Sequence, residues 1–520
     1  MDYLDYVQMT KGQRLAYKIK SFFTSIPGAI KKFFMAIGYF IKKFFVGIGN
    51  FFKNYGSRFA NGDAGTKLSY IIMGAGNMMH KQFMKGLIFL AAEVAYIYFM
   101  ITFGSFYISR IFTSDLVLLS SKVTRDGMQY GTATVGRVVA TFTEDPRTGV
   151  DKINEAIPYD NSNKILLFFI LTVLVTVAFI GVYIANTKSA YATQKIIESG
   201  KKPESFGNEI KSYLDERFHV TLLTLPIILL LLFTVLPIIF TIFMAFTNYD
   251  KNHQPPGNLY QWVGLKNFAE VFYSSPKKSA TFGKVLLWTL VWAFFATFTN
   301  YIFGIILALL INKKGIKFKG FWRTMFVITA AVPQFVTLLI MRLLLDDHGA
   351  INSLISGIGL PSVRFLTDPN IARITVIVVN MWVGIPYTML ISSGLLMNIP
   401  EDLYESARID GANAFQQFTK ITFPYIFFVT TPYLITTFVG NINNFNVIFF
   451  LTGMSESAEG YYVATKTDLL VNWLYKLTIG TEKAYNLAAV IGILIFVICA
   501  IGSLITFNMS KASKNEEEFS

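Results

Sequence analysis

The sequence predicts an all-α polytopic membrane protein with about eight transmembrane helices. Of its 520 residues, 53% are hydrophobic and only 15% are charged, and the mean hydropathy is +0.48. This composition leaves too few polar side chains to cover a water-soluble chain of this length. The 50 Phe and 26 Tyr agree, because helices in a bilayer can carry aromatic rings on every face. We therefore expect the chain to cross a membrane many times.

The predicted spans are apolar runs long enough to cross a bilayer. A hydrocarbon core of about 30 Å needs roughly 20 mostly apolar residues per helix. Runs near that length lie at 86–109, 165–185, 219–247, 285–311, 324–345, 372–397, 425–450 and 485–507.

The distribution of Lys and Arg predicts the orientation of these spans. Thirteen Lys and Arg residues but only three Asp precede the first run. Five more Lys and Arg residues lie in the connection 312–323, which contains no acidic residue. Basic connections stay on the cytoplasmic side, so both termini are expected to be cytoplasmic. The segments 110–164, 248–284, 346–371 and 451–484 then face outward. Because the net charge of +14 reflects this asymmetry, we expect membrane lipids and no nucleic acid as partners.

Residues 1–85 form a basic amphipathic segment, expected in the cytoplasm, that contains an eleven-residue repeat. Ile19, Ile30 and Ile41 each begin a unit with Lys and a pair of Phe residues. At about 100° per residue, eleven residues return within roughly 20° of the starting face, so Phe and Ile form one stripe beside Lys. This pattern predicts a helix that lies on the membrane against anionic headgroups. A docking helix for a partner protein is the alternative.

The connection 398–424 carries the motif that decides the functional class. Pro400, Glu401 and Asp402 suit the start of a short helix, because acidic side chains stabilise its positive end. The residues that follow have a recognisable spacing: Glu405, Ser406, Ala407, Gly411, Ile421 and Pro424. Glycine at 411 suits the turn that ends the helix. An ordinary solvated loop is the alternative interpretation.

This spacing resembles the E-A-A-x3-G-x9-I-x-L-P motif of the permease subunits of binding-protein-dependent ABC importers. Ser406 and Phe423 are mild departures from it. In that family the short helix is a coupling helix that docks on the ATPase subunit. The resemblance implies coupling roles for Glu401, Glu405, Ser406, Ala407, Asp410 and Gly411.

The resemblance extends over 219–510 and implies the six-helix core of a type I ABC importer permease. Residues 86–218 would add two transmembrane helices around the outer loop 110–164, and 511–520 a cytoplasmic tail. The run 467–472 looks specifically like the MalF-type maltose and maltodextrin permeases. Such a subunit resides in the bacterial plasma membrane. Its implied partners are a second, MalG-type permease, an ATPase dimer and an extracellular solute-binding protein.

The chain lacks the P-loop of an ATPase and the H-E-x-x-H motif of a metalloprotease, so we do not expect an enzyme. No G-x4-G-K-[ST] occurs, since Gly200-Lys201 is followed by Lys and Gly283-Lys284 by Val. ATP and magnesium are therefore expected on partner subunits, with no cofactor on this chain. Four histidines without a close His/Glu pair exclude a metalloprotease, and the single Cys499 cannot form a metal cluster. We expect no metal site.

Polar side chains near the middle of two spans are the candidate substrate site. In lipid such groups are costly, so they should face a cavity or another helix. In the seventh span, steps of four and three put three of them on one helical face: Thr437, Asn441 and Asn444. The sixth span repeats this spacing, with one apolar neighbour: Asn380, Gly384, Tyr387 and Val383. The resemblance implies that these seven positions match the maltose site of MalF-type permeases. Hydrogen bonds that merely hold the helices together are the alternative.

The predicted function is that of the transmembrane permease of an ATP-driven importer for maltose or maltodextrin. A galactan-type or other oligosaccharide is an open alternative. An ion-driven carrier would need acids within the membrane, yet the spans contain only Glu93 as a clear candidate, and we expect it to make a helix contact. A scaffold or insertion factor would not need the motif of 398–424.

Overall fold

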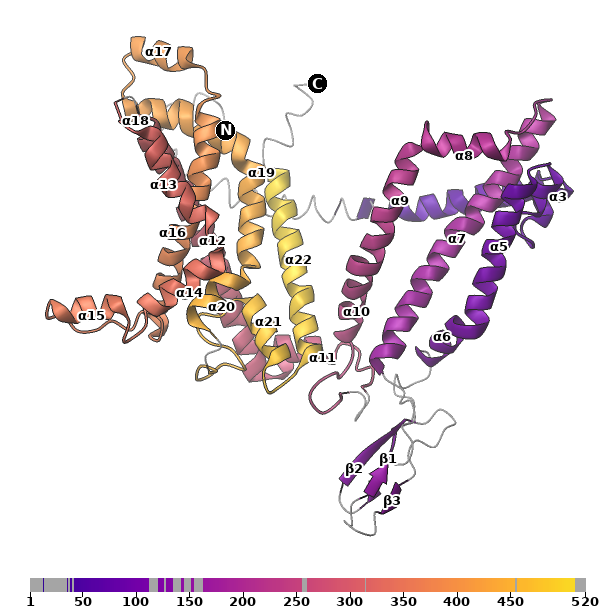
Figure 1. Cartoon of the computed structure of the whole chain (residues 1–520), viewed down its shortest axis with the longest axis horizontal. Helices are drawn as coiled ribbons and strands as arrows, with labels where there is room; N and C mark the ends of the chain where they lie inside the picture. The colour runs from indigo at the N-terminus through magenta and orange to yellow at the C-terminus, as the bar shows by residue number, and fades with distance from the viewer. Residues whose placement is uncertain are drawn as a thin grey trace. The chain divides into compact units, whose positions relative to one another are not determined.

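The computed structural model describes residues 13, 35, 38–39, 42–111, 120–125, 128–133, 142–144, 151–153, 162–254, 260–313, 315–453 and 456–509. Within these ranges the chain is nearly all helical, as predicted (Figure 1). It divides into two compact units. The described residues of Gly38–Asn267 and Ala484–Ala489 form the first, and those of Phe268–Lys483 with the remainder of the last helix form the second.

The prediction of about eight spans is confirmed within the described ranges. One pair of helices bent by 83° adds an eighth candidate span to the seven long apolar ones. The seven are Phe83–Ile111, Ser162–Glu198, Phe218–Met244, Pro276–Asn312, Pro369–Leu396, Ala414–Ile442 and Tyr485–Leu504, and the bent pair is Lys319–Thr329 with Gln334–Leu344.

The first unit is built around three of these spans. After a helix at 42–60, its helical elements are α3 (Ala64–Leu68), α4 (Ala75–Met79), α5 (Phe83–Phe99), η1 (Met100–Gly104), α6 (Ser105–Ile111), α7 (Ser162–Glu198), α8 (Phe206–Leu214), α9 (Phe218–Leu230), η2 (Leu231–Val235) and α10 (Leu236–Met244). Between α6 and α7, the connection contains two antiparallel hairpins that the sequence did not predict. They pair β1 (Ser120–Arg125) with β2 (Met128–Ala133) and β3 (Phe142–Glu144) with β4 (Asp151–Ile153).

The segment between the helix at 42–60 and α5 is hydrogen-bonded onto α7. The Gln194 amide oxygen accepts from the Asp63 backbone at 3.0 Å, and the Asn186 amide oxygen accepts from the Gly74 backbone at 2.8 Å. Glu93 of α5 accepts from the Met73 backbone N–H at 2.8 Å. This acid therefore makes a structural contact, in keeping with the expectation.

The eleven-residue repeat is described only at its last unit. Phe44, Phe45 and Phe52 are exposed on the helix at 42–60. Tyr55 of this helix hydrogen-bonds to Tyr183 of α7, with 2.9 Å between the hydroxyl oxygens. Of the units beginning at Ile19 and Ile30, only Met35, Gly38 and Tyr39 lie within the described residues. Membrane binding by the repeat stays a prediction.

The second unit contains the remaining spans and the shorter helices that join them. Its helical elements are α11 (Lys266–Ala269), η3 (Glu270–Ser274), α12 (Pro276–Asn312), α13 (Lys319–Ala331), α14 (Gln334–Leu344), α15 (Ala350–Gly357), α16 (Pro369–Leu396), α17 (Glu401–Ile409), α18 (Ala414–Gln417), η4 (Phe418–Thr422), α19 (Phe423–Ile442), α20 (Phe445–Thr452), α21 (Leu470–Ile479) and α22 (Tyr485–Met509). The first residues of α11 and of α22 belong to the first unit.

Helix α12 packs along both α16 and α19 and contributes to three buried apolar clusters, two of which flank its middle. Trp292 belongs to a buried cluster with Leu338 and Val376, in the first half of α12. Tyr301 belongs to another, with Ile426 and Leu434. The stretch of α12 between these clusters is polar, and there the candidate site lies.

Two predicted spans are wrong in detail. The run 324–345 is broken, because α13 ends at Ala331 and Pro333 precedes α14; the residue before a proline disfavours helical backbone. The run 425–450 ends early, since α19 stops at Ile442 and Asn444 caps the separate helix α20. Asparagine favours this position because its side chain can replace a backbone partner. Asn444 is therefore not on the helix of Thr437 and Asn441.

Candidate functional site

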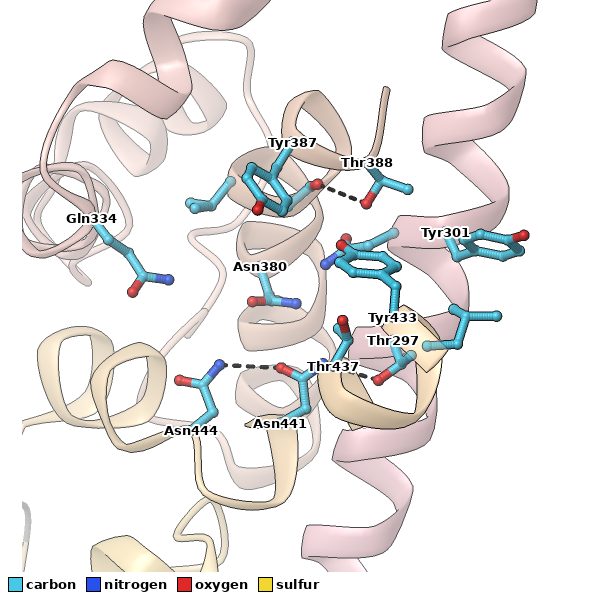
Figure 2. Close-up of a pocket in the computed structure, with 14 residues that line it drawn as sticks. Thr297, Tyr301, Gln334, Asn380, Tyr387, Thr388, Tyr433, Thr437, Asn441 and Asn444 are labelled. Atoms are coloured by element: carbon cyan, nitrogen blue, oxygen red, sulfur yellow. Dashed lines mark hydrogen bonds between the residues drawn. The ribbon is translucent and has the colours of Figure 1, made fainter. Parts of the chain in front are cut away.

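A pocket of about 350 Å³ opens in the second unit, between helices α12, α16 and α19. Its volume lies within the range of small-molecule sites, roughly 300–1,000 Å³. All seven residues singled out from the sequence line it, namely Asn380, Val383, Gly384, Tyr387, Thr437, Asn441 and Asn444. Although the helix break separates Asn444 from α19, the start of α20 brings its side chain back to the same wall (Figure 2).

The lining contains amides, hydroxyls and aromatic rings and no charged side chain. Tyr387 and Tyr433 lie with ring centroids 6.4 Å apart, and Tyr387 is 55% exposed. Figure 2 shows the Asn380 amide with Gln334 on one side and the Tyr433 ring on the other. Amides and hydroxyls can donate to and accept from hydroxyl groups, and rings provide flat apolar faces. The pocket is thus suited to a neutral polyhydroxylated ligand.

Two of the predicted asparagines are already engaged with the protein. The Asn441 amide donates to the Thr297 hydroxyl at 2.9 Å and accepts from the Asn444 amide at 3.3 Å. Trp292 donates to the Asn441 carbonyl at 3.1 Å. The Asn444 side chain also accepts from the Val447 backbone N–H, which caps α20. These bonds show that the open alternative, interhelical hydrogen bonding, applies at least in part to this pair.

Two other amides in the pocket wall have no protein partner within the described part of the chain. The Nδ2 atom of Asn380 and the Oδ1 atom of Asn300 are both buried and unpaired. Asn380 is 5% exposed. A buried amide without a partner costs about 1–3 kcal/mol. The two atoms are a donor and an acceptor on residues that line the same pocket.

Seven further pocket residues lie outside the two groups that the sequence singled out. They are Thr297, Asn300, Tyr301, Gln334, Thr388, Tyr433 and Leu434. The signal was present on α12, where Thr297, Asn300 and Tyr301 stand at steps of three and one in the middle of the predicted span 285–311. No periodicity could have found Gln334, because the break before α14 turns it into the pocket.

The predicted coupling residues form the exposed helix α17 and the turn that ends it. The helix begins after Pro400, with Glu401 and Asp402 in its first turn. Gly411 has φ of +73°, a left-handed conformation that glycine adopts without strain. The Tyr404 hydroxyl lies 2.8 Å from that of Thr422, which holds α17 on the following span. Of the predicted residues only Ala407 is half-buried, and Glu401, Glu405, Ser406, Asp410 and Gly411 are exposed.

Comparison with known proteins places this architecture among transporters. Residues 300–513 match the model of the family described as "binding-protein-dependent transport system inner membrane component". The galactooligosaccharide transport permease GanP of Bacillus subtilis is 37% identical over 71% of this chain and 88% of its own length. The maltodextrin permease MalC of Streptococcus pneumoniae is 33% identical over 86% and 96%.

A third relative links the chain to the MalF permeases. The maltose/maltodextrin permease MalF of Vibrio vulnificus is 34% identical over 52% of each chain. These relatives are permease components, not enzymes, and ATP hydrolysis in ABC importers belongs to separate subunits. The chain is a multi-pass sugar permease subunit of an ABC importer and belongs to the binding-protein-dependent transport system inner membrane components.

Proposed function

We propose that this chain imports maltodextrins across the bacterial plasma membrane as one of two permease subunits of an ABC importer. The main support for this proposal is that all seven residues that resemble the maltose site of MalF-type permeases line one pocket. Its uncharged lining supports a neutral oligosaccharide. The ion-driven carrier has no such support, because the pocket lining contains no acidic side chain and the Glu93 carboxylate accepts a hydrogen bond from the Met73 backbone N–H.

Galactooligosaccharides are the second candidate substrate. Their permease GanP is 37% identical to this chain, compared with 33% for the maltodextrin permease MalC. Glucose and galactose units differ in the orientation of one hydroxyl, so the same amides could serve either sugar. We favour maltodextrin because the pocket residues match the maltose site one by one.

The proposed route of energy coupling runs through α17. Glu405 is exposed on this helix, as are the apolar side chains of Leu403 and Ile409. An exposed helix with charged and apolar groups fits a docking surface on another protein. We assign the contact with an ATPase dimer to Glu401, Glu405, Ser406, Ala407, Asp410 and Gly411, with ATP and magnesium bound by that dimer. A MalG-type permease and an extracellular binding protein complete the proposed assembly, and both termini of this chain are cytoplasmic.

Uptake by the purified importer tests the substrate. The complex, isolated with its partner subunits, would be reconstituted in proteoliposomes containing ATP and supplied with its binding protein. We expect labelled maltotriose to accumulate and unlabelled maltotriose to compete far better than a galactotriose. The reverse order of competition would make galactooligosaccharide import the function. Uptake that needs an ion gradient and no ATP would overturn the importer assignment.

A further inference from the structure

We propose that Asn300 of α12 is a specificity-determining residue that reads one sugar hydroxyl, working together with Asn380 on the facing helix α16. The inference rests on the proposed function of this pocket and extends it to a residue that the sequence comparison with the maltose site did not include. Three observations carry it: both amides have an atom without a hydrogen-bond partner, a glycine makes room for the Asn300 amide, and the two free atoms differ in polarity.

The first observation is that the free atoms are buried and belong to residues that line the pocket. Asn300 Oδ1 and Asn380 Nδ2 have no partner among the described protein groups, although both residues face the cavity. Nearby polar groups differ: the Asn441 amide and the Tyr301 hydroxyl each have a partner within 3.0 Å. Leaving a buried amide atom unpaired is unfavourable, so these two atoms gain most from a ligand that pairs them.

The second observation is that Gly384 makes room for the Asn300 amide. A Cβ atom at position 384 would lie 2.1 Å from Asn300 Nδ2 and 2.6 Å from its Cγ. Any other residue there would force the amide to move. Asn380 stands one helical turn before Gly384, so it shares the same face of α16. The glycine therefore sets the position of the Asn300 amide against the turn that carries Asn380.

The third observation is that the two free atoms have opposite polarity. Asn300 Oδ1 can only accept a hydrogen bond, whereas Asn380 Nδ2 can only donate one. A sugar ring carries adjacent hydroxyls, and each of them can donate and accept. One hydroxyl would donate to Asn300 while its neighbour accepts from Asn380. A ligand with an ether or a carbonyl at the first position could not satisfy Asn300, so this amide selects for a free hydroxyl there.

The test compares maltotriose with a panel of its monodeoxy and monodeoxyfluoro analogues in the reconstituted complex. The binding protein is loaded to saturation, after its affinity for each analogue has been measured, so that only the permease discriminates. Fluorine can accept a hydrogen bond weakly but cannot donate one. At the position whose hydroxyl donates to Asn300, the deoxy and the deoxyfluoro analogue should therefore be equally poor transport substrates of the unaltered complex. In Asn300→Leu, which keeps the approximate volume, this discrimination should disappear.

We expect Asn300→Leu to raise the KM for maltotriose about tenfold with little change in kcat, the loss of one hydrogen bond to a neutral partner. Thr299→Val is the matched control, because the neighbouring Thr299 is half-buried, does not line the pocket, and its hydroxyl donates to its own helix, to the Phe295 carbonyl at 2.6 Å. Unchanged KM and intact discrimination in Asn300→Leu would overturn the proposal.

A second variant keeps the test decisive if Asn300→Leu fails to assemble. Gly384→Ala displaces the Asn300 amide and should abolish the same discrimination, so an assembled Gly384→Ala complex that still discriminates counts against the proposal. If the unaltered complex does not import maltotriose at all, the maltodextrin assignment fails by itself. The same panel built on a galactotriose then decides the role of Asn300.

Discussion

Asn441 and Asn380 lie in the same pocket, yet alanine at these positions should have different consequences. Asn441→Ala removes the bond to Thr297 at 2.9 Å and the bond from Asn444 at 3.3 Å. Each is worth about 0.5–1.5 kcal/mol, so the loss of both should lower stability by about 1–3 kcal/mol. Asn380→Ala breaks no described hydrogen bond and removes an unpaired buried donor. Its stability should stay within about 1 kcal/mol of that of the unaltered protein.

The effects on sugar binding follow the opposite order. Asn380 is the amide with a free donor, and without it a buried sugar hydroxyl is left unpaired, at a cost of about 1–3 kcal/mol. This corresponds to roughly a 5- to 150-fold loss of affinity. The Asn441 amide already has two protein partners, so few of its hydrogen bonds remain for a sugar. The loss of transport in Asn441→Ala should therefore follow its loss of stability.

Two measurements on the same preparations separate these effects. Thermal unfolding of the detergent-solubilised complex reports stability, and the concentration dependence of uptake reports affinity. Asn443→Ala is the control, since Asn443 is exposed outside the pocket lining and makes only long contacts, 3.4 Å to Val439 and 3.5 Å to Cys499. A destabilised Asn380→Ala complex with unchanged KM would refute the reasoning, as would equal losses in all three variants.

The remaining predictions concern parts of the chain outside the pocket. Glu405→Lys should abolish uptake and sugar-stimulated ATP hydrolysis while membrane insertion, measured by expression and protease protection, stays normal; undiminished ATP hydrolysis would exclude α17 as the coupling helix. Lys476→Met leaves the buried Asp468 carboxylate, now 2.8 Å from the lysine, without its counter-charge. It should destabilise the complex by about 3–5 kcal/mol in thermal unfolding, and a neutral result would contradict the pairing. Burial raises the pKa of Asp63, but hydrogen bonds from Thr66 and His80 outweigh it and hold the pKa below its ordinary 3.8. The ionised carboxylate thus contributes stability that is present above about pH 4 and lost as the pH falls through the lowered pKa. Asp63→Asn should show a weaker loss of stability in acid, and identical acid unfolding curves would argue against this contribution.

Much of the fold could be predicted from the sequence because a membrane imposes simple rules. Every helix that crosses it must be long and apolar, and this requirement located every span, although the ends of several differ from the predicted bounds. The short helix α17 was equally predictable, since its start at Pro400, its acidic first turn and its end at Gly411 are all local signals. Local rules failed where two helices are broken. Val332-Pro333 and Asn443-Asn444 could each have been tolerated within a distorted span.

The candidate site shows the same division between local and tertiary information. Polar spacing alone singled out Asn380 and Asn441, since a polar group inside a span needs a partner whatever the fold. Which of them has a partner depends on distances across helices: Thr297 reaches Asn441, and no described protein group reaches Asn380 Nδ2. The sequence by itself thus determined that these residues face inward. Only the packing of α12 against α16 and α19, made close by Gly384, decided which amides are free for a ligand.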